Sequence, residues 1–217
     1  MTEILNIIKQ RVLIMKGTQR IELIETNDAI YIGETNKNGK RNGFGTLYSN
    51  DGTIHLGLWC DGFASGHGIC KHKNGNEYTG KWINNIFHGR NNEIYYSNGD
   101  KYRGNVVKGI IIGKGEMKYN NGDIYKGEWK NGVWEGMGEI KYKNNEKYKG
   151  LFKNGLYEDE GIFTWGNGNT YAGQWKNGEV SGYGTVINKT SSYMTYYSGN
   201  WNNPNEWNKH NLIIDNE

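Results

Sequence analysis

Apolar and polar residues alternate along most of the chain in a five-residue phrase that returns about every 23 residues. Its clearest copy, Tyr125-Lys-Gly-Glu-Trp129, is followed by Tyr148–Phe152 and Tyr171–Trp175. Alternate side chains of an extended strand share a face, so Tyr, Gly and Trp point one way and Lys and Glu the other. A period of this length indicates a repeat protein. The remaining copies are Tyr31–Thr35, His55–Trp59, Tyr78–Trp82, Tyr102–Val106 and Tyr197–Trp201.

Each phrase is followed by a turn and by a second strand that opens Gly-x-Gly. The turn is usually Asn-Gly, as at Asn131-Gly132, and Asn and Gly both accept the positive φ of tight hairpin turns. Large side chains then recur at every second position, as at Ile140 and Tyr142. We therefore expect one β-hairpin per repeat and an all-β fold: a single elongated, twisted antiparallel sheet of consecutive hairpins. Stacked rings would cover one another on one face, and Lys, Glu and Asn would cover the outer face.

The ends of the chain lie outside the repeat. Residues 1–30 are predicted to form an N-terminal cap, residues 31–201 the repeat array and residues 202–217 a C-terminal edge or tail. The spacing of Ile4 to Val12 allows an amphipathic helix that binds a membrane or a partner, whereas Val12–Ile24 suits two strands. A cover for the exposed edge of the first repeat is favoured. In the tail, Pro204 suits either an edge cover or a partner-binding segment.

Composition narrows the class of function. Only 35% of the 217 residues are apolar, the net charge is +3, and basic residues are interleaved with acidic ones, which argues against nucleic-acid binding. No apolar run is long enough for a transmembrane helix, and Met1-Thr-Glu lacks the basic start of a secretory leader. Two cysteines make no disulfide framework. We expect an intracellular protein, cytoplasmic or peripheral at a membrane or the cytoskeleton.

The phrase Tyr-x-Gly-x-Trp, a turn and Gly-x-Gly resemble the MORN repeat (membrane occupation and recognition nexus). The resemblance covers residues 31 to about 201, as seven units and a partial eighth. It implies a β-hairpin solenoid that serves as a scaffold or attachment module for membranes, cytoskeletal structures or protein partners, with dimerisation through terminal repeats in several members. Thr35 and Val106 replace the Trp, and Asn91 and Asp159 replace a glycine. The third unit also has an extra residue, expected before Asn98-Gly99.

The sequence contains no residue pattern typical of a catalytic site or a metal site. Cys60, His67, Cys70 and His72 lie in one hairpin, but neither cysteine belongs to a paired zinc knuckle, and alternation places Cys70 and His72 on the aromatic side with Cys60 outside. No Ser or Cys is tied to a His, and the Gly-x-Gly phrases open no helix. Neither an enzyme nor a cofactor is therefore expected.

Two binding functions are consistent with the sequence. One is a non-catalytic scaffold that binds a protein partner, or a second copy, through an aromatic face left partly open along the single-layer sheet. The predicted partner-binding residues are Tyr78, Trp82, Tyr102, Tyr125, Trp129, Tyr148, Phe152, Tyr171 and Trp175. The alternative is a peripheral membrane module recognising anionic phospholipids. Its candidate residues are Lys126, Lys130, Lys141, Lys143, Lys147, Lys149 and Lys153.

Overall fold

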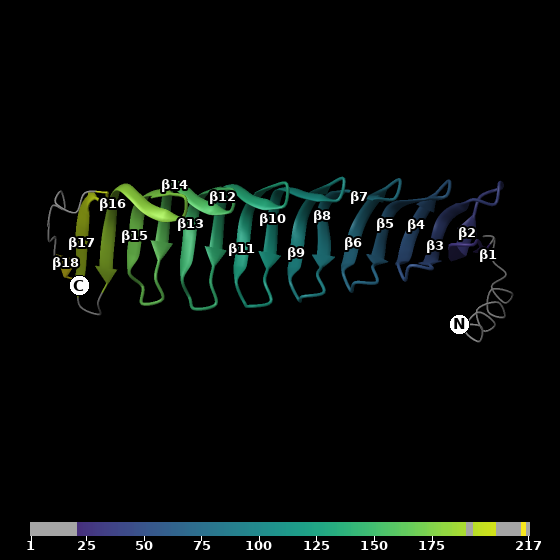
Figure 1. Ribbon diagram of the computed structural model, residues 1–217, viewed down its shortest axis with the longest axis horizontal. Coiled ribbons are helices and arrows are strands. Elements are labelled where there is room, and N and C mark those ends of the chain that lie inside the picture. The colour runs from purple at the N-terminus through teal and green to yellow at the C-terminus, as the bar shows by residue number, and fades with distance from the viewer. Residues whose placement is uncertain (1–20, 190–192, 203–213, 216–217) are drawn as a thin grey trace. The chain divides into compact units, whose positions relative to one another are not determined.

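The computed structural model describes residues 21–189, 193–202 and 214–215, and every regular element in these ranges is a β-strand (Figure 1). The chain divides into two units, residues 1–109 and 110–217. The strands of the first unit are β1 (Ile21–Glu25), β2 (Ala29–Thr35), β3 (Arg41–Ser49), β4 (Ile54–Cys60), β5 (Phe63–Lys71), β6 (Glu77–Ile83), β7 (Ile86–Phe87), β8 (Gly89–Tyr95) and β9 (Lys101–Val107). Those of the second are β10 (Ile110–Lys118), β11 (Ile124–Lys130), β12 (Val133–Lys141), β13 (Lys147–Lys153), β14 (Leu156–Thr164), β15 (Thr170–Lys176), β16 (Glu179–Lys189), β17 (Tyr193–Asn200) and β18 (Ile214–Asp215).

Within each unit, consecutive strands pair antiparallel in chain order. β1 pairs with β2, β2 with β3 and so on, and β6 pairs with both β7 and β8. The second unit continues the same way from β10 to β18. The predicted class, an all-β antiparallel array of consecutive hairpins, is confirmed. β1 belongs to the sheet although it falls in the predicted cap. The predictions for Ile4–Met15 and Pro204 concern residues outside the described ranges. Within the described ranges, no helix has the length and apolar character needed to cross a membrane.

The hairpin turns have the geometry that their sequence predicts. Asn131 and Gly132 join β11 to β12 with φ values of 52° and 79°, and Asn154 and Gly155 join β13 to β14 with 51° and 81°. Two successive residues with positive φ form the turn that matches the twist of the strands it connects. Each Asn-Gly turn therefore fixes the register of its own hairpin.

The two glycines of Gly-x-Gly serve different purposes. The first, such as Gly136, has a φ of 80° and lies where the register of the hairpin shifts. The second, Gly138, is paired with Gly127 on one side and Gly150 on the other. A Cβ on Gly138 would lie 2.6 Å from the Tyr125 hydroxyl, so the ring occupies the space that a side chain would fill. Equivalent pairs form a row of glycines across each unit.

Two hydrogen bonds hold the aromatic rings over this row. The Tyr148 hydroxyl donates to the carbonyl of Leu151 in its own strand at 3.0 Å. The Trp175 indole N–H donates to the carbonyl of Gly161 in the preceding strand at 3.2 Å. Both groups keep a partner inside the core, so burying these rings leaves no polar atom of theirs unsatisfied.

The end of each hairpin bends back over the aromatic column. After the register shift between Gly127 and Trp129, the Trp134 ring stacks on Tyr125 with centroids 4.4 Å apart. In the next repeat Tyr157 stacks on Tyr148 at 3.7 Å. The rings therefore have a second layer, which the sequence analysis did not predict, supplied by the bent second strand.

The third repeat departs from the pattern at a different residue from the one expected. Asn92, rather than Asn91, takes the place in the glycine row, where it pairs with Gly104. Its Oδ1 accepts a hydrogen bond from the Lys81 amide at 3.0 Å. The register shifts between Gly89 and Asn92, so the extra residue is accommodated there and not before Asn98-Gly99.

His55 takes the place of the leading tyrosine in the second repeat. It is 6% exposed, and its ring meets Trp59 and Trp82 edge-on at 5.2 and 4.6 Å. Its Nε2 is buried and has no hydrogen-bond partner. Burial, with a smaller effect of the Arg41 charge, lowers the pKa of His55 from 6.5 to about 4. His55 is therefore neutral in the folded protein at pH values where the unfolded chain binds a proton.

This difference makes the free energy of unfolding depend on pH. The stabilisation is complete above pH 6.5 and is lost as pH falls toward 4, because protonation then favours the unfolded chain. We expect a loss of about 1 kcal/mol per pH unit, or about 2 kcal/mol by pH 4.5. Urea unfolding of the wild type and of His55→Tyr at pH 7 and pH 4.5 measures it. Equal pH dependence in the two proteins would contradict this explanation.

Candidate functional site

The predicted partner-binding rings form the core of the sheet. Eight of the nine are between 0% and 7% exposed, and Tyr78 is half-buried between His72 and Phe87. The open aromatic face that we expected is not present, because the bent hairpin ends cover it. The structure does bring these residues together within each unit, but as packing. A role for them in partner binding stays a prediction that requires the hairpin ends to open.

The outer face of the second unit starts as a ladder of alternating charges. Across β10 to β13, Glu116 pairs with Lys126, Lys126 with Glu139 and Glu139 with Lys149. Opposite charges on directly paired residues stabilise a sheet by a few tenths of a kcal/mol to about 1 kcal/mol each. Here the predicted polar outer face is found.

Toward β14–β16 the same row becomes apolar. Lys149 pairs with Ile162, Ile162 with Ala172 and Ala172 with Thr185. Ile162 is 47% exposed, and the nearby Tyr183 is 65% exposed. The outer face of the second unit therefore changes along its length from charged to apolar.

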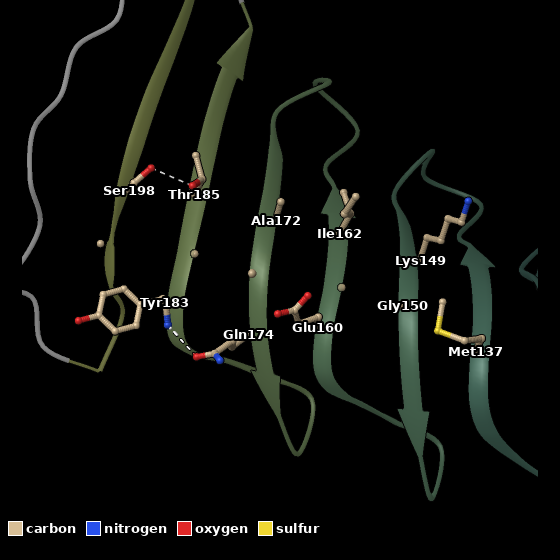
Figure 2. A pocket seen from close by; sticks show the side chains of 14 residues that line it. Met137, Lys149, Gly150, Glu160, Ile162, Ala172, Gln174, Tyr183, Thr185 and Ser198 are labelled. Atoms are coloured by element: carbon tan, nitrogen blue, oxygen red, sulfur yellow. Dashed lines mark hydrogen bonds between the residues drawn. The ribbon is translucent and has the colours of Figure 1, made fainter.

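A groove of about 740 Å³ crosses the strands in this apolar part (Figure 2). Its walls are side chains of β12 to β17, and the backbone of the glycine row forms part of its floor. Met137, on β12, is 52% exposed at one end, and Tyr183 stands at the other. The groove is open because Ala172 and the glycines fill little space between the larger side chains.

Several polar groups of the groove are held in place. The Gln174 side-chain oxygen accepts a hydrogen bond from the Tyr183 amide at 2.9 Å. The hydroxyls of Thr185 and Ser198 lie 2.8 Å apart. These contacts fix the strand that carries Tyr183, so a ligand would meet a surface that is largely formed in advance.

A second depression, of about 620 Å³, adjoins the first. It is lined by the charged residues of β10–β13 and shares Met137 and Lys149 with the apolar groove. Together they make one surface, which we call the outer groove. It has a charged half over β10–β13 and an apolar half over β14–β17.

In the first unit the outer face differs from the sequence prediction. Instead of Lys, Glu and Asn, its strands β3–β5 carry exposed apolar side chains, which we call the outer apolar patch. The patch consists of Phe44, Tyr48, Ile54, Leu56, Leu58 and Ile69. The prediction of a uniformly polar outer face is therefore wrong for this part of the chain.

The cysteine and histidine cluster does not form a metal site. Cys60 is exposed on the outer side, whereas Cys70 is buried on the aromatic side, as alternation predicts. The Cys70 sulfur lies 3.7 Å from the His72 ring, and burial raises the pKa of the Cys70 thiol to about 11. Among the described residues no group of three or more metal-binding side chains comes together.

Sequence reasoning missed the residues of the outer groove. Met137, Ile162, Ala172 and Tyr183 occupy outward positions where neighbouring repeats of the second unit carry Lys or Glu. The available signal was a break in the polar pattern at these positions in the fifth to seventh repeats.

Comparisons with known proteins bear on the repeat itself. The MORN-repeat family model matches residues 37–54, 57–77, 78–90, 102–124, 125–147, 148–170 and 171–187. None of the curated proteins compared matches the chain. Among solved structures, the chain is similar to the TCP domain of SAS-4 (dCPAP) from Drosophila melanogaster, in complex with a proline-rich motif of Ana2 (dSTIL). That similarity has a TM-score of 0.43 and 14% identity, over 91% of this chain and 90% of that one.

Proposed function

The chain belongs to the MORN-repeat family, and on this premise we propose that it is a scaffold that binds a segment of a protein partner in the outer groove. The observation that carries the proposal is the exposure of Met137, Ile162 and Tyr183, at 52%, 47% and 65%, around a depression floored by glycine backbone. Apolar side chains left in water beside a concave surface are typical of binding sites.

The form of the groove limits the kind of partner. It runs across the strands, so a bound segment would be recognised by its side chains and would not extend the sheet as another strand. Apolar residues of the segment would pack on Ile162, Ala172 and Tyr183, and burial contributes roughly 25 cal/mol per Å² of apolar surface. Charged residues would meet Lys126, Glu139 or Lys149 in the other half. A segment with apolar residues beside mixed charges fits best.

We expect Ile162→Glu together with Tyr183→Ala to weaken capture of the partner at least tenfold, since the variant loses two exposed contacts and places a charge in the groove. The full chain would be used as bait in extracts of the native host, with binding of the captured protein then measured by titration. The matched control is Val133→Glu with Leu156→Ala. These residues are 43% and 47% exposed beside hairpin turns outside the groove.

The control variant should bind within twofold of the wild type. Equal binding by the groove variant and the wild type would refute the proposal. Trp129→Ala with Trp175→Ala, which tests the aromatic face, removes core rings, so its result needs a parallel measurement of folding.

Recognition of anionic phospholipids is the second candidate function. Some of the lysines predicted for it lie near glutamates, and others lie near another lysine. Lys130, Lys141 and Lys153 lie 3.9, 3.1 and 3.8 Å from glutamate oxygens. Lys147 is the cross-strand neighbour of Lys141, a pair of like charges that an anionic surface would stabilise. Flotation with anionic vesicles that disappears at high salt would support this candidate, and flotation equal with neutral vesicles would refute it.

A further inference from the structure

The outer apolar patch is a continuous surface on the first unit. On β4, Ile54, Leu56 and Leu58 all point outward and are 38%, 37% and 44% exposed. Their cross-strand partners extend the patch in both directions, since Leu58 pairs with Phe44 and Leu56 with Ile69. A patch of this kind on a protein surface indicates that something covers it.

The repeat fold does not require apolar residues at these positions. In the second unit, β11 occupies the same place in the repeat as β4, and there Lys126 and Glu128 stand where β4 has Leu56 and Leu58. Those charged side chains support the same pairing between strands. We therefore infer that the outward apolar residues of β4 pack against something, in a contact that β11 does not make.

The patch continues to the start of the described chain. Ile32 of β2 lies in the same cross-strand row as Thr46 and Leu56, and Leu23 of β1 pairs with Ile32. Residue 20 is thus joined directly to β1, which pairs with the strand that borders the patch. Glu25 and Glu34, also on the outer face of β1 and β2, add negative charge at this border.

The sequence of residues 1–20 matches this surface in two respects. It carries four basic residues, Lys9, Arg11, Lys16 and Arg20, against the single acidic Glu3, which complements Glu25 and Glu34. It is also rich in aliphatic side chains. These are Ile4, Leu5, Ile7, Ile8, Val12 and the run Leu13–Met15.

The segment is long enough to reach the patch. Five strands spaced by about 4.8 Å make the distance from β1 to β5 roughly 20 Å. The 13 residue-to-residue steps from Ile8 to Ile21 can span up to about 40 Å when extended. A tethered segment is present at an effective concentration in the millimolar range, far above that of a separate partner.

We propose that residues 1–20 bind the outer apolar patch of their own chain and so cover the face of β3–β5. This site differs from the sheet edge, which the sequence analysis favoured as the place covered by the N-terminal cap. It is independent of the partner-binding outer groove. The segment shields Leu56, Leu58 and their neighbours from water and keeps this face from binding a second chain.

The natural thiol of Cys60 provides a test in the full chain. Cys60 is exposed at the end of β4 on the patch side, whereas Cys70 is buried. In the variant Ile8→Cys we expect mild oxidation of the dilute protein to form a disulfide between residues 8 and 60 within one chain. Non-reducing peptide mapping identifies the bond, and the mass of the product shows whether one chain or two are joined.

Two further variants make the result specific. In Ile8→Cys with Leu56→Glu and Leu58→Glu, the disulfide should form at least ten times more slowly, because the segment no longer binds. In Ile8→Cys with Cys60→Ser and Lys130→Cys, the acceptor thiol moves to the equivalent position of β11, where we expect no rapid disulfide. A disulfide between two chains, or a rate unchanged by the glutamates or by moving the acceptor, would overturn the proposal.

Discussion

Replacing Gly161 by alanine is expected to lower the free energy of unfolding by about 3 kcal/mol or more, although it adds a single methyl group. The added Cβ would lie 2.3 Å from the Tyr148 hydroxyl oxygen and 2.4 Å from the ring carbon that carries it. The ring cannot move aside, because Tyr148 is fully buried and stacked on Tyr157. Urea unfolding followed by tryptophan fluorescence measures the loss.

A glycine outside the row provides the control. Gly132 has a φ of 79° and no atom within 4 Å of the place its Cβ would take, so Gly132→Asn should cost well under 1 kcal/mol. Adding Tyr148→Phe to Gly161→Ala removes the closest contact and should recover part of the loss. Equal effects of Gly161→Ala and Gly132→Asn would show that the glycine row is not a packing requirement.

Tyr148→Ala should be strongly destabilising, at about 3–5 kcal/mol. The ring stacks on Tyr157 and meets Phe152 and Trp175 edge-on at 5.1 and 5.3 Å. Its removal leaves a cavity in the middle of the aromatic column, and two neighbouring repeats lose contacts at once. Chemical denaturation gives the size of the effect, and hydrogen exchange shows which repeats open.

Graded variants separate the ring from its hydroxyl. Tyr148→Phe keeps the ring and loses only the bond to the Leu151 carbonyl, so about 1 kcal/mol is expected. Tyr183→Ala removes a ring that is 65% exposed and should change the free energy of unfolding by less than about 0.5 kcal/mol. Similar losses for Tyr148→Ala and Tyr183→Ala would mean that the column is not the core.

Most of the local structure could be predicted because the same sequence pattern recurs in successive repeats. The alternation of Tyr125, Gly127 and Trp129 with lysine and glutamate assigns faces correctly, and Asn131-Gly132 marks the turn. The bend of the hairpin end could not be predicted from this pattern. It depends on the register shift after Gly127, which brings Trp134 onto the Tyr125 ring, and no spacing in one sequence specifies that contact.

The outer groove was missed for a related reason. Alternation identifies Met137, Ile162 and Tyr183 as outward residues, but each lies on a different strand, and each looks like an isolated substitution along the sequence. Only the pairing of Lys149 with Ile162 and of Ile162 with Ala172 shows that they surround one depression. Sites that lie across strands require the register, which the turns determine only within each hairpin.

The tyrosine and tryptophan hydrogen bonds differ in whether they connect neighbouring strands. This difference determines where the strands of the array separate most easily. The tyrosine bond closes within one strand, as from Tyr148 to Leu151, whereas the tryptophan bond ties a strand to the one before it, as from Trp175 to Gly161. Phe152 has no N–H with which to make that tie. Val106, in the first unit, lacks it as well. In a pulling experiment, rupture should therefore start at the seams before Val106 and Phe152 and stop at the next indole.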